Sequence, residues 1–213
     1  MKLSTLRPEQ LRLYAVTDRR WLNGQTLADA VEAAIQGGVT CVQIREKHLD
    51  FDAFLSEAKQ VAAVCRKYGV PFIVNDNVSI AMQCGADGVH LGQSDLEIAA
   101  ARELLGAEKI IGATAKTVDQ ALAAQKAGAD YLGVGAVYAT GTKTDTRQIT
   151  HETLREVCSA AEIPAVAIGG ITAENAPSLT GTGIAGIAVV SAIFAQTDIC
   201  SVAVNLREIA DRL

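Results

Sequence analysis

The stretch Gly85-Ala86-Asp87-Gly88-Val89 indicates how the chain is built, because related phrases recur along its length. The other copies are Gly38-Val39-Thr40-Cys41-Val42, Gly128-Ala129-Asp130-Tyr131-Leu132 and Gly183-Ile184-Ala185-Gly186-Ile187. In each copy a glycine follows a segment with helical periodicity and leads into a short run rich in β-forming residues. A glycine in this place predicts a left-handed helix end. The recurrence therefore predicts a fold assembled from similar βα units.

Short apolar runs and helix-period segments alternate on either side of these copies, as expected for strands buried on both faces. The predicted strands are Leu13–Val16, Cys41–Ile44, Phe72–Val74, Gly88–Leu91, Ile110–Gly112, Tyr131–Val134, Ala165–Ile168 and Ile187–Val190. The predicted helices are Leu27–Gln36, Phe51–Tyr68, Ile80–Cys84, Leu96–Leu105, Val118–Ala127, Glu152–Ala161, Ala173–Leu179 and Ser201–Leu213. Candidate N-caps are Asp50, Thr117, Thr150 and Thr172.

This alternation, without a linker or a break in composition, predicts a single (β/α)8 TIM barrel that spans residues 1–213 as one domain. A doubly wound open sheet is the structural alternative, and it is weakened because the first and last strands both end in polar residues. The connection from Gly135 to Thr150 is unusually long and is predicted to be a flexible functional loop. Its Thr140-Gly141-Thr142-Lys143 segment lacks the register of a P-loop.

Composition restricts the partners and the compartment of the protein. The chain has 213 residues, a net charge of -5 and an apolar fraction of 49%, which together favour a small-molecule protein over a nucleic-acid or membrane-surface binder. No apolar run approaches the roughly 18 residues of a membrane helix, and no signal peptide is visible at the N-terminus. Five scattered cysteines without a Cys-x-x-Cys pair predict reduced thiols and a cytoplasmic location.

The segment Gln43-Ile44-Arg45-Glu46-Lys47 follows an expected buried strand. Because side chains alternate along an extended chain, Gln43, Arg45 and Lys47 point to the same face. Three donors at the carboxyl end of a strand predict an anion clamp. The alternative is a solvated loop in which Glu46 makes a surface ion pair.

Two aspartates at neighbouring strand ends predict a metal site. Asp76 and Asp95 follow adjacent strands, whose axes lie about 4.8 Å apart, and two such carboxylates repel unless a proton or a cation lies between them. With Asn75 and Gln93 nearby, oxygen ligands dominate, which favours Mg²⁺ over Zn²⁺. The alternative is that either aspartate caps the helix that follows it.

Main-chain amides predict a second anion site, since active sites of such barrels lie at the carboxyl ends of the strands. Gly169-Gly170 and Ser191 follow the seventh and eighth strands and are suited to cradle a phosphate, unless the glycines form only a tight turn. The cationic clamp with its metal site is suited to a diphosphate, and the main-chain amides are suited to a monophosphate. Because no nucleophile and base pair is evident, these two sites fit the joining of two phosphorylated molecules, with diphosphate as leaving group. His90 lies on a buried strand and is interpreted as a hydrogen-bonded core histidine.

These pieces, taken in order, resemble the thiamine-phosphate synthase family along nearly the whole chain. The matching motifs are Leu13-Tyr14-Ala15-Val16-Thr17-Asp18, Val42-Gln43-Ile44-Arg45-Glu46-Lys47, Asn75-Asp76, Gly85-Ala86-Asp87-Gly88-Val89-His90-Leu91-Gly92-Gln93 with Asp95, Ile111-Gly112-Ala113-Thr114, Thr140-Gly141-Thr142-Lys143, Ile168-Gly169-Gly170-Ile171 and Val190-Ser191-Ala192-Ile193.

The resemblance implies an activity and a role for each motif. The family couples a hydroxymethylpyrimidine diphosphate to a hydroxyethylthiazole phosphate, or its carboxylated form, through a pyrimidine-methyl cation that the thiazole nitrogen captures. By resemblance the pyrimidine diphosphate would be held by Gln43, Ile44, Arg45, Glu46, Lys47, Asn75, Thr114 and Lys143, among which Arg45, Thr114 and Lys143 would be catalytic. Mg²⁺ would be bound by Asp76 and Asp95. The thiazole phosphate would be held by Thr140, Gly141, Thr142, Gly170, Val190 and Ser191.

The chain departs from the family pattern in places, and other functions compete with the one that the resemblance implies. The family usually has Ser at Thr114 and often His at Lys116, and Ala139 and Gly141 replace the usual lid residues, which predicts a looser lid. The alternatives are a thiazole tautomerase of the same fold, a non-catalytic phosphate-binding barrel and a Schiff-base aldolase. The expected partners are the two small-molecule substrates, and the expected assembly is a homodimer.

Overall fold

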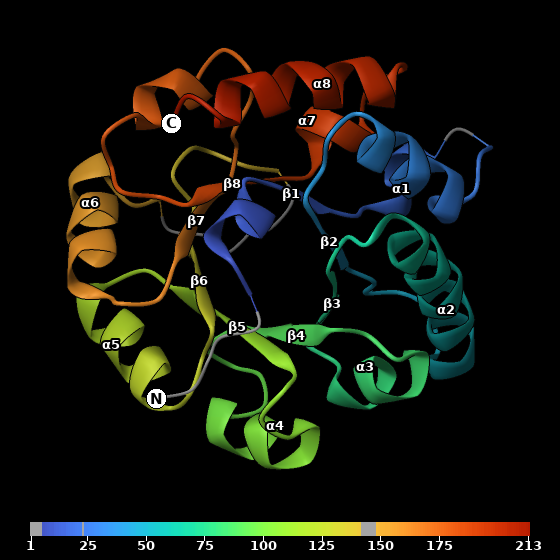
Figure 1. The fold of residues 1–213 in the computed structure, drawn as a ribbon, viewed down its shortest axis with the longest axis horizontal. Coiled ribbons are helices and arrows are strands. Elements are labelled where there is room, and N and C mark those ends of the chain that lie inside the picture. Colours follow the sequence, from blue (N-terminus) through green and yellow to red (C-terminus); the bar gives the residue numbers. More distant parts are fainter. Residues whose placement is uncertain (1–5, 23, 142–147) are drawn as a thin grey trace.

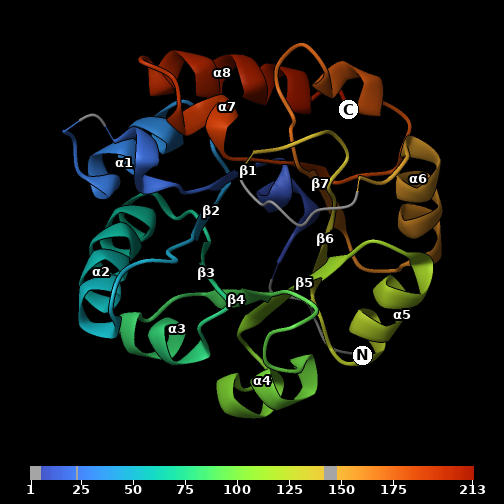
Figure 2. The same cartoon turned by 180° about the vertical axis from the view of Figure 1, so that it is seen from behind.

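A closed ring of parallel strands forms the centre of the molecule (Figures 1 and 2). The computed structural model describes residues 6–22, 24–141 and 148–213. Within these ranges each strand pairs with its neighbours in chain order, and the last strand closes on the first. The strands are β1 (Leu13–Val16), β2 (Cys41–Ile44), β3 (Phe72–Asn75), β4 (Gly88–Leu91), β5 (Ile110–Ala115), β6 (Tyr131–Gly135), β7 (Ala165–Ile168) and β8 (Gly186–Val189). The predicted TIM barrel is confirmed.

Helices surround the ring and connect successive strands. The α-helices are α1 (Leu27–Gln36), α2 (Phe51–Tyr68), α3 (Val78–Cys84), α4 (Ile98–Leu105), α5 (Val118–Lys126), α6 (His151–Ala160), α7 (Ser191–Phe194) and α8 (Ile199–Ala210). The short 3-10 helices are η1 (Pro8–Leu11), η2 (Arg19–Trp21) and η3 (Ala176–Leu179). Over the described residues, no helix has both the length and the apolar character needed to cross a membrane.

The predicted helix Ala173–Leu179 is wrong, because only the 3-10 turn η3 forms there. Pro177 lies in its first turn, and the four residues of η3 are too few for α-helical hydrogen bonding to propagate. Thr172 is likewise not the cap, because η3 begins at Ala176 and Asn175 occupies its N-cap position. Helix α7 follows β8 directly and was not predicted, because four residues carry too little periodicity.

The recurring glycines adopt the conformation that their sequence context predicts. Gly85 ends α3 with φ +70, a left-handed conformation in which a side chain would be strained. The corresponding glycines in the other three copies also have positive φ. The side chains of Asp50, Thr117 and Thr150 accept N-cap hydrogen bonds at the starts of α2, α5 and α6, which confirms those three caps.

Two apolar layers make up the core. Outward-facing strand residues such as Val42 and Ile44 pack against the helices, while inward-facing residues such as Tyr14 and Tyr131 fill the barrel interior. Both strand faces are buried, so the strands read as apolar runs rather than as alternating patterns. Leu11 of η1 belongs to the interior cluster, and this helix lies over the centre of the ring in Figure 1.

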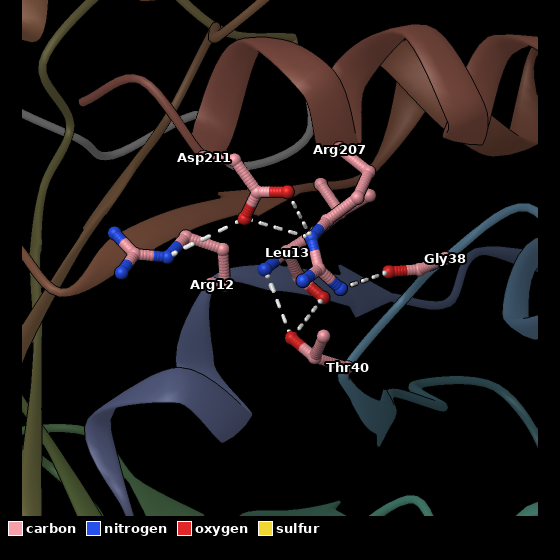
Figure 3. A network of polar contacts seen from close by, with 6 residues as sticks. All are labelled: Arg12, Leu13, Gly38, Thr40, Arg207 and Asp211. Carbon is pink, nitrogen blue, oxygen red and sulfur yellow. Dashed lines mark hydrogen bonds and ion pairs between the residues drawn. The ribbon is translucent and has the colours of Figure 1, made fainter.

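A polar network fastens the C-terminal helix to the N-terminal end of the barrel (Figure 3). The Arg207 guanidinium donates to the Asp211 carboxylate at 2.9 Å and to the Gly38 carbonyl at 3.2 Å, and Arg12 approaches the same carboxylate at 3.7 Å. The hydroxyl of Thr40 bonds both the N–H and the carbonyl of the first residue of β1, at 2.9 and 3.1 Å. These contacts join α8, β1 and the start of β2 where the two ends of the barrel sequence meet.

Candidate active site

A cavity of about 720 Å³ opens at the carboxyl ends of the strands. It is lined by residues from all parts of the chain, which the barrel brings together although they are far apart in sequence. The predicted site residues that line it are Gln43, Arg45, Lys47, Asn75, Asp76, Asp95, Thr114, Thr140, Gly141, Gly170, Val190 and Ser191. Their convergence at one rim is an observation, and their individual roles stay predictions.

Two other predicted residues, Ile44 and Glu46, lie away from the cavity. The side chain of Ile44 is fully buried between the barrel and the helices and does not line the cavity. Glu46 also points away from the cavity, because its position on the chain has the opposite parity to Arg45 and Lys47. Thr142 and Lys143 lie outside the described residues.

Arg45 presents a cation with unused hydrogen-bonding capacity. Its backbone N–H donates to the hydroxyl of Thr17 at 3.1 Å, which fixes the chain just after β2. Within the described part of the chain, its buried Nε atom has no hydrogen-bond partner. A buried charged donor of this kind is costly unless a ligand pairs with it. Arg45 is therefore suited to bind an anion in the cavity.

Asp76 and Asp95 bring two carboxyl groups together, and one lysine contacts Asp76. The ammonium group of Lys47 lies 2.5 Å from Oδ2 of Asp76. Burial, and then the neighbouring carboxyl group of Asp76, raise the pKa of Asp95. The Asp95 carboxylate also accepts the N–H of Gly92 at 2.6 Å, whereas Glu97 precedes α4, so Asp95 does not cap that helix.

Asp76 is held in a strained backbone conformation. Its φ is +62, which is the one positive value among the described non-glycine residues. Its N–H donates to the carbonyl of His90 at 2.9 Å, so the pairing of β3 with β4 continues past the strand end and holds the residue in place. Such strain costs on the order of 1–3 kcal/mol and persists where the surrounding structure demands it. In this conformation Asp76 lines the cavity.

The two aspartates fit a magnesium ion better than a zinc ion. Among the described residues, no group of three or more His, Cys, Asp or Glu side chains is arranged to hold a metal. Mg²⁺ needs only one or two protein carboxylates because it keeps several waters and binds substrate phosphate oxygens. A cation between Asp76 and Asp95 would also relieve the repulsion that raises the pKa of Asp95.

The opposite side of the cavity offers main-chain donors. In the described residues, neither the N–H of Gly170 nor that of Ser191 has a protein acceptor. A Cβ at Gly170 would collide with the carbonyl of Ala139, and the residue has φ +65. Gly170 thus lets the connection after β6 lie directly against the turn after β7, a close approach that a tight turn alone would not require.

Glu46 belongs to a buried acidic pair behind the rim. Its side chain is only 2% exposed and lies near Glu57 of α2, with the Arg19 guanidinium 3.9 Å from Glu46 and 3.3 Å from Glu57. Burial, and then the charge of Glu57, raise the pKa of Glu46 to about 7. The expected alternative of a solvated loop with a surface ion pair does not describe this residue.

A buried polar chain that the sequence did not predict crosses the barrel interior. It joins Gln43 to Thr114 through Tyr14, Tyr131 and His90, by hydrogen bonds of 2.7 to 3.0 Å. The interpretation of His90 as a hydrogen-bonded core residue is confirmed. Alternation along the strand could have placed Tyr14 in the interior, because Tyr14 and Val16 lie two residues apart and point to the same face. Tyr131 belongs to the same interior cluster.

Fold and site together define the class of the protein. The cavity lies where (β/α)8 barrel enzymes have their active sites, and it combines cationic side chains, opposed carboxylates and bare amides. This combination is typical of barrels that bind phosphorylated small molecules.

Comparisons with known proteins identify the family. The family model described as thiamine monophosphate synthase matches residues 13–193. The chain is 52% identical over 197 residues to a thiamine-phosphate synthase of Ruminiclostridium cellulolyticum, covering 92% of this chain and 94% of that protein. It is 50% identical over 189 residues to the thiamine-phosphate synthase of Clostridium novyi, covering 88% and 93%. The solved structure of a Pyrococcus furiosus thiamine phosphate pyrophosphorylase superposes with a TM-score of 0.89 at 38% identity, covering 96% and 97%. The chain belongs to the thiamine monophosphate synthase family.

Proposed function

We propose that this chain is a transferase that couples a hydroxymethylpyrimidine diphosphate to a hydroxyethylthiazole phosphate and releases diphosphate. The observation that carries the proposal is one cavity that holds Arg45, whose buried Nε has no hydrogen-bond partner among the described residues, the opposed carboxyls of Asp76 and Asp95, and the bare amides. These groups form two anion sites of different chemistry, as two phosphorylated substrates require. The relatives named for the same activity support the assignment.

At the first anion site, Asp76 and Asp95 would hold Mg²⁺, which when bound neutralises charge on the diphosphate. Arg45 and Lys47 would bind the diphosphate oxygens, with Lys47 exchanging part of its contact with Asp76 for the ligand. Thr114 would add a hydroxyl donor. Lys143, proposed as a further donor, lies outside the described residues. Positioned cations of this kind stabilise a leaving anion without any proton transfer.

The proposed bond changes balance without an acid or a base. The bond between the pyrimidine methylene carbon and the diphosphate oxygen breaks, and the electron pair leaves with diphosphate. The resulting pyrimidine-methyl cation is captured by the lone pair of the thiazole nitrogen. The main-chain amides of Gly170 and Ser191, together with Thr140, Gly141 and Val190, would hold the thiazole phosphate so that this nitrogen faces the methylene. Thr142 is proposed for the same role.

One experiment tests the proposal and separates it from the alternatives. The purified protein is mixed with both phosphorylated precursors and Mg²⁺, and thiamine phosphate and diphosphate are measured over time. We expect the two products in equal amounts, and no coupling when a chelator is present. Isomerisation of the thiazole phosphate alone, without coupling, would instead indicate a tautomerase, and binding without turnover would indicate a phosphate-binding barrel.

A Schiff-base aldolase is disfavoured by the setting of Lys47, one of two described lysines that line the cavity. Such an enzyme needs a lysine with a lowered pKa in a buried, apolar setting. Lys47 is instead 44% exposed and paired with Asp76. An exposed, ion-paired lysine of this kind is suited to bind an anion.

We further propose a cytoplasmic location and a homodimeric assembly. The location is supported by the five cysteines, which are all free thiols, three of them buried. The assembly is a prediction to be tested by sedimentation at several protein concentrations.

A further inference from the structure

The buried polar chain links two sides of the cavity through the barrel interior. The amide nitrogen of Gln43 lies 2.8 Å from the Tyr14 hydroxyl, which lies 2.7 Å from the Tyr131 hydroxyl. The Tyr131 hydroxyl lies 2.9 Å from Nδ1 of His90, whose Nε2 lies 3.0 Å from Oγ1 of Thr114. Gln43 and Thr114 both line the cavity, from β2 and β5, and the two tyrosines are at most 1% exposed.

The number of protons on the groups of the buried polar chain determines the direction in which its hydrogen bonds are donated. Burial raises the pKa of Tyr14 and of Tyr131 well above the usual value, so each hydroxyl keeps its single proton. Tyr14 accepts from the Gln43 amide, and the arrangement that leaves no buried hydroxyl proton unpaired is the one in which Tyr14 donates to Tyr131. In the same arrangement Tyr131 donates its proton to Nδ1 of His90. With Nδ1 as an acceptor, the neutral ring carries its proton on Nε2 and donates it to Thr114.

We propose that Tyr14, Tyr131 and His90 are positioning residues that orient the Thr114 hydroxyl as a donor into the cavity. Since the Thr114 oxygen accepts the N–H of His90, its own proton is left for a ligand. An anionic oxygen is the acceptor that such a donor suits. The inference rests on the proposed function only for the identity of that ligand, which is the diphosphate group. The direction of the chain is independent of it.

The two strands that carry Thr114 and Tyr131 leave room for the buried polar chain. Gly112 of β5 stands opposite Tyr131 in the register of the sheet, and an added Cβ there would collide with the tyrosine ring. Gly133 of β6 stands opposite Thr114, and an added Cβ there would lie 2.9 Å from Cε1 of His90. Two glycines in strand interiors weaken a sheet unless something needs the space. Here the space is taken by the polar chain.

The tautomer of His90 reports the direction of hydrogen-bond donation along the buried polar chain. Proton and nitrogen NMR of the imidazole rings at neutral pH separates the two nitrogens, and the His90→Gln variant assigns the resonances among the three histidines of the chain. We expect the proton on Nε2 in the unchanged protein and a mixture of tautomers in Tyr131→Phe. A proton on Nδ1 of the unchanged protein would overturn the direction, because it would require the Gln43 amide to be reversed.

The consequence for the ligand is measured with inorganic pyrophosphate and Mg²⁺ by calorimetry. We expect Tyr131→Phe and Thr114→Val each to weaken pyrophosphate binding roughly 10-fold, as for one hydrogen bond to a charged group. The double variant should be no weaker than either single variant, because both changes remove the same donor. Thr114→Ser should restore the affinity of the unchanged protein.

Tyr68→Phe is the matched control, since it removes a surface hydroxyl bonded to Glu32, far from the cavity, and should change nothing. Unfolding temperatures of all variants separate a loss of stability from a loss of binding. Tyr131→Phe with undiminished pyrophosphate affinity, or with an effect that adds to that of Thr114→Val, would overturn the positioning role. An unchanged protein that binds no pyrophosphate would instead overturn both the proposed function and the donor role of Thr114.

Discussion

The two ends of the barrel carry polar groups in opposite states. At the N-terminal end, Arg207 and Asp211 satisfy each other, and Arg207 also bonds the main chain (Figure 3). At the carboxyl end, Arg45 has a buried donor without a partner in the described residues, and Asp76 faces Asp95 in a strained backbone conformation. The same eight strands therefore carry an end that stabilises the fold and an end that is prepared for ligands.

The difference has a physical basis. Ion pairs in which each charge has a partner in the protein contribute little to stability when exposed, but they leave no group unsatisfied. Unpaired donors, opposed carboxylates and strained residues all destabilise the free protein. They become favourable only when a cation and an anion occupy the cavity. Variants at the two ends should therefore show opposite changes in stability and activity.

The largest effect is expected for Asp76→Asn. Asparagine tolerates the positive φ and keeps the shape of the side chain, so the change removes only the charge. We expect coupling to fall about 10²–10³-fold, the scale of one lost electrostatic contributor to the transition state. The unfolding temperature should change little, because the repulsion with Asp95 and the half-exposed ion pair with Lys47 are lost together. Steady-state kinetics and thermal unfolding of one preparation measure both, and near-normal turnover would contradict the role of Asp76.

Arg45→Met is expected to have the next largest effect. Methionine fills the space of the side chain stem, while the guanidinium cation is lost. We expect the affinity for pyrophosphate to fall about 10–100-fold, as for one or two charge-assisted hydrogen bonds, without a loss of stability. Arg45→Lys is the matched control, since it keeps the charge but loses the planar fork. Equal affinities of all three proteins would remove Arg45 from the site.

Glu46→Gln sharpens the comparison through pH. Because its folded pKa is about 7 against a usual value of 4.5, Glu46 binds a proton in the folded state that is released on unfolding between these pH values. Its contribution to stability is thus fully present below about pH 4.5 and is lost as the pH rises to about 7.

The side chain of the Gln variant does not titrate, and it offers an N–H to Glu57 at every pH. We expect it to flatten the fall in stability between pH 5 and 7, and to raise the free energy of unfolding at pH 8 by about 1 kcal/mol. Urea unfolding across pH measures this, with the exposed Glu156→Gln as control. A pH profile that matches the unchanged protein would contradict the raised pKa of Glu46.

The smallest effect is expected for Asp211→Asn at the N-terminal end. It weakens the contacts with Arg207 and Arg12, and since the side chain is 47% exposed the free energy of unfolding should fall by only about 0.5–1 kcal/mol. Coupling measured at 25 °C should stay unchanged. A large loss of activity in a folded Asp211→Asn protein would break the division between the two ends.

Most of the fold could be predicted from local patterns. Strands such as Leu13–Val16 and Cys41–Ile44 begin and end where predicted, because short apolar runs bounded by polar residues leave little choice. The segment at Ala173–Leu179 misled the prediction, since its apolar spacing resembles a helix but Pro177 and the short length allow only a 3-10 turn.

The candidate site could be predicted only in part. Strand ends identified Arg45 and Asp76 because parallel strands bring their carboxyl ends to one rim. The chain through Tyr14 and Tyr131 was missed, since the hydrogen bond between residues 117 positions apart depends on which rings meet inside the barrel. The burial of Glu46 against Glu57 was missed for the same reason, because only packing determines the environment of a charge.

The most direct test of the central claim is the binding of Mn²⁺, as a paramagnetic substitute for Mg²⁺, followed by EPR in the presence of pyrophosphate. The unchanged protein and Asp211→Asn should bind one Mn²⁺ with the same affinity, and Asp76→Asn should bind it at least about 10-fold more weakly, as expected when one of two carboxylate ligands loses its charge. Equal Mn²⁺ affinity in all three proteins would contradict a metal and diphosphate site at the carboxyl end of the barrel.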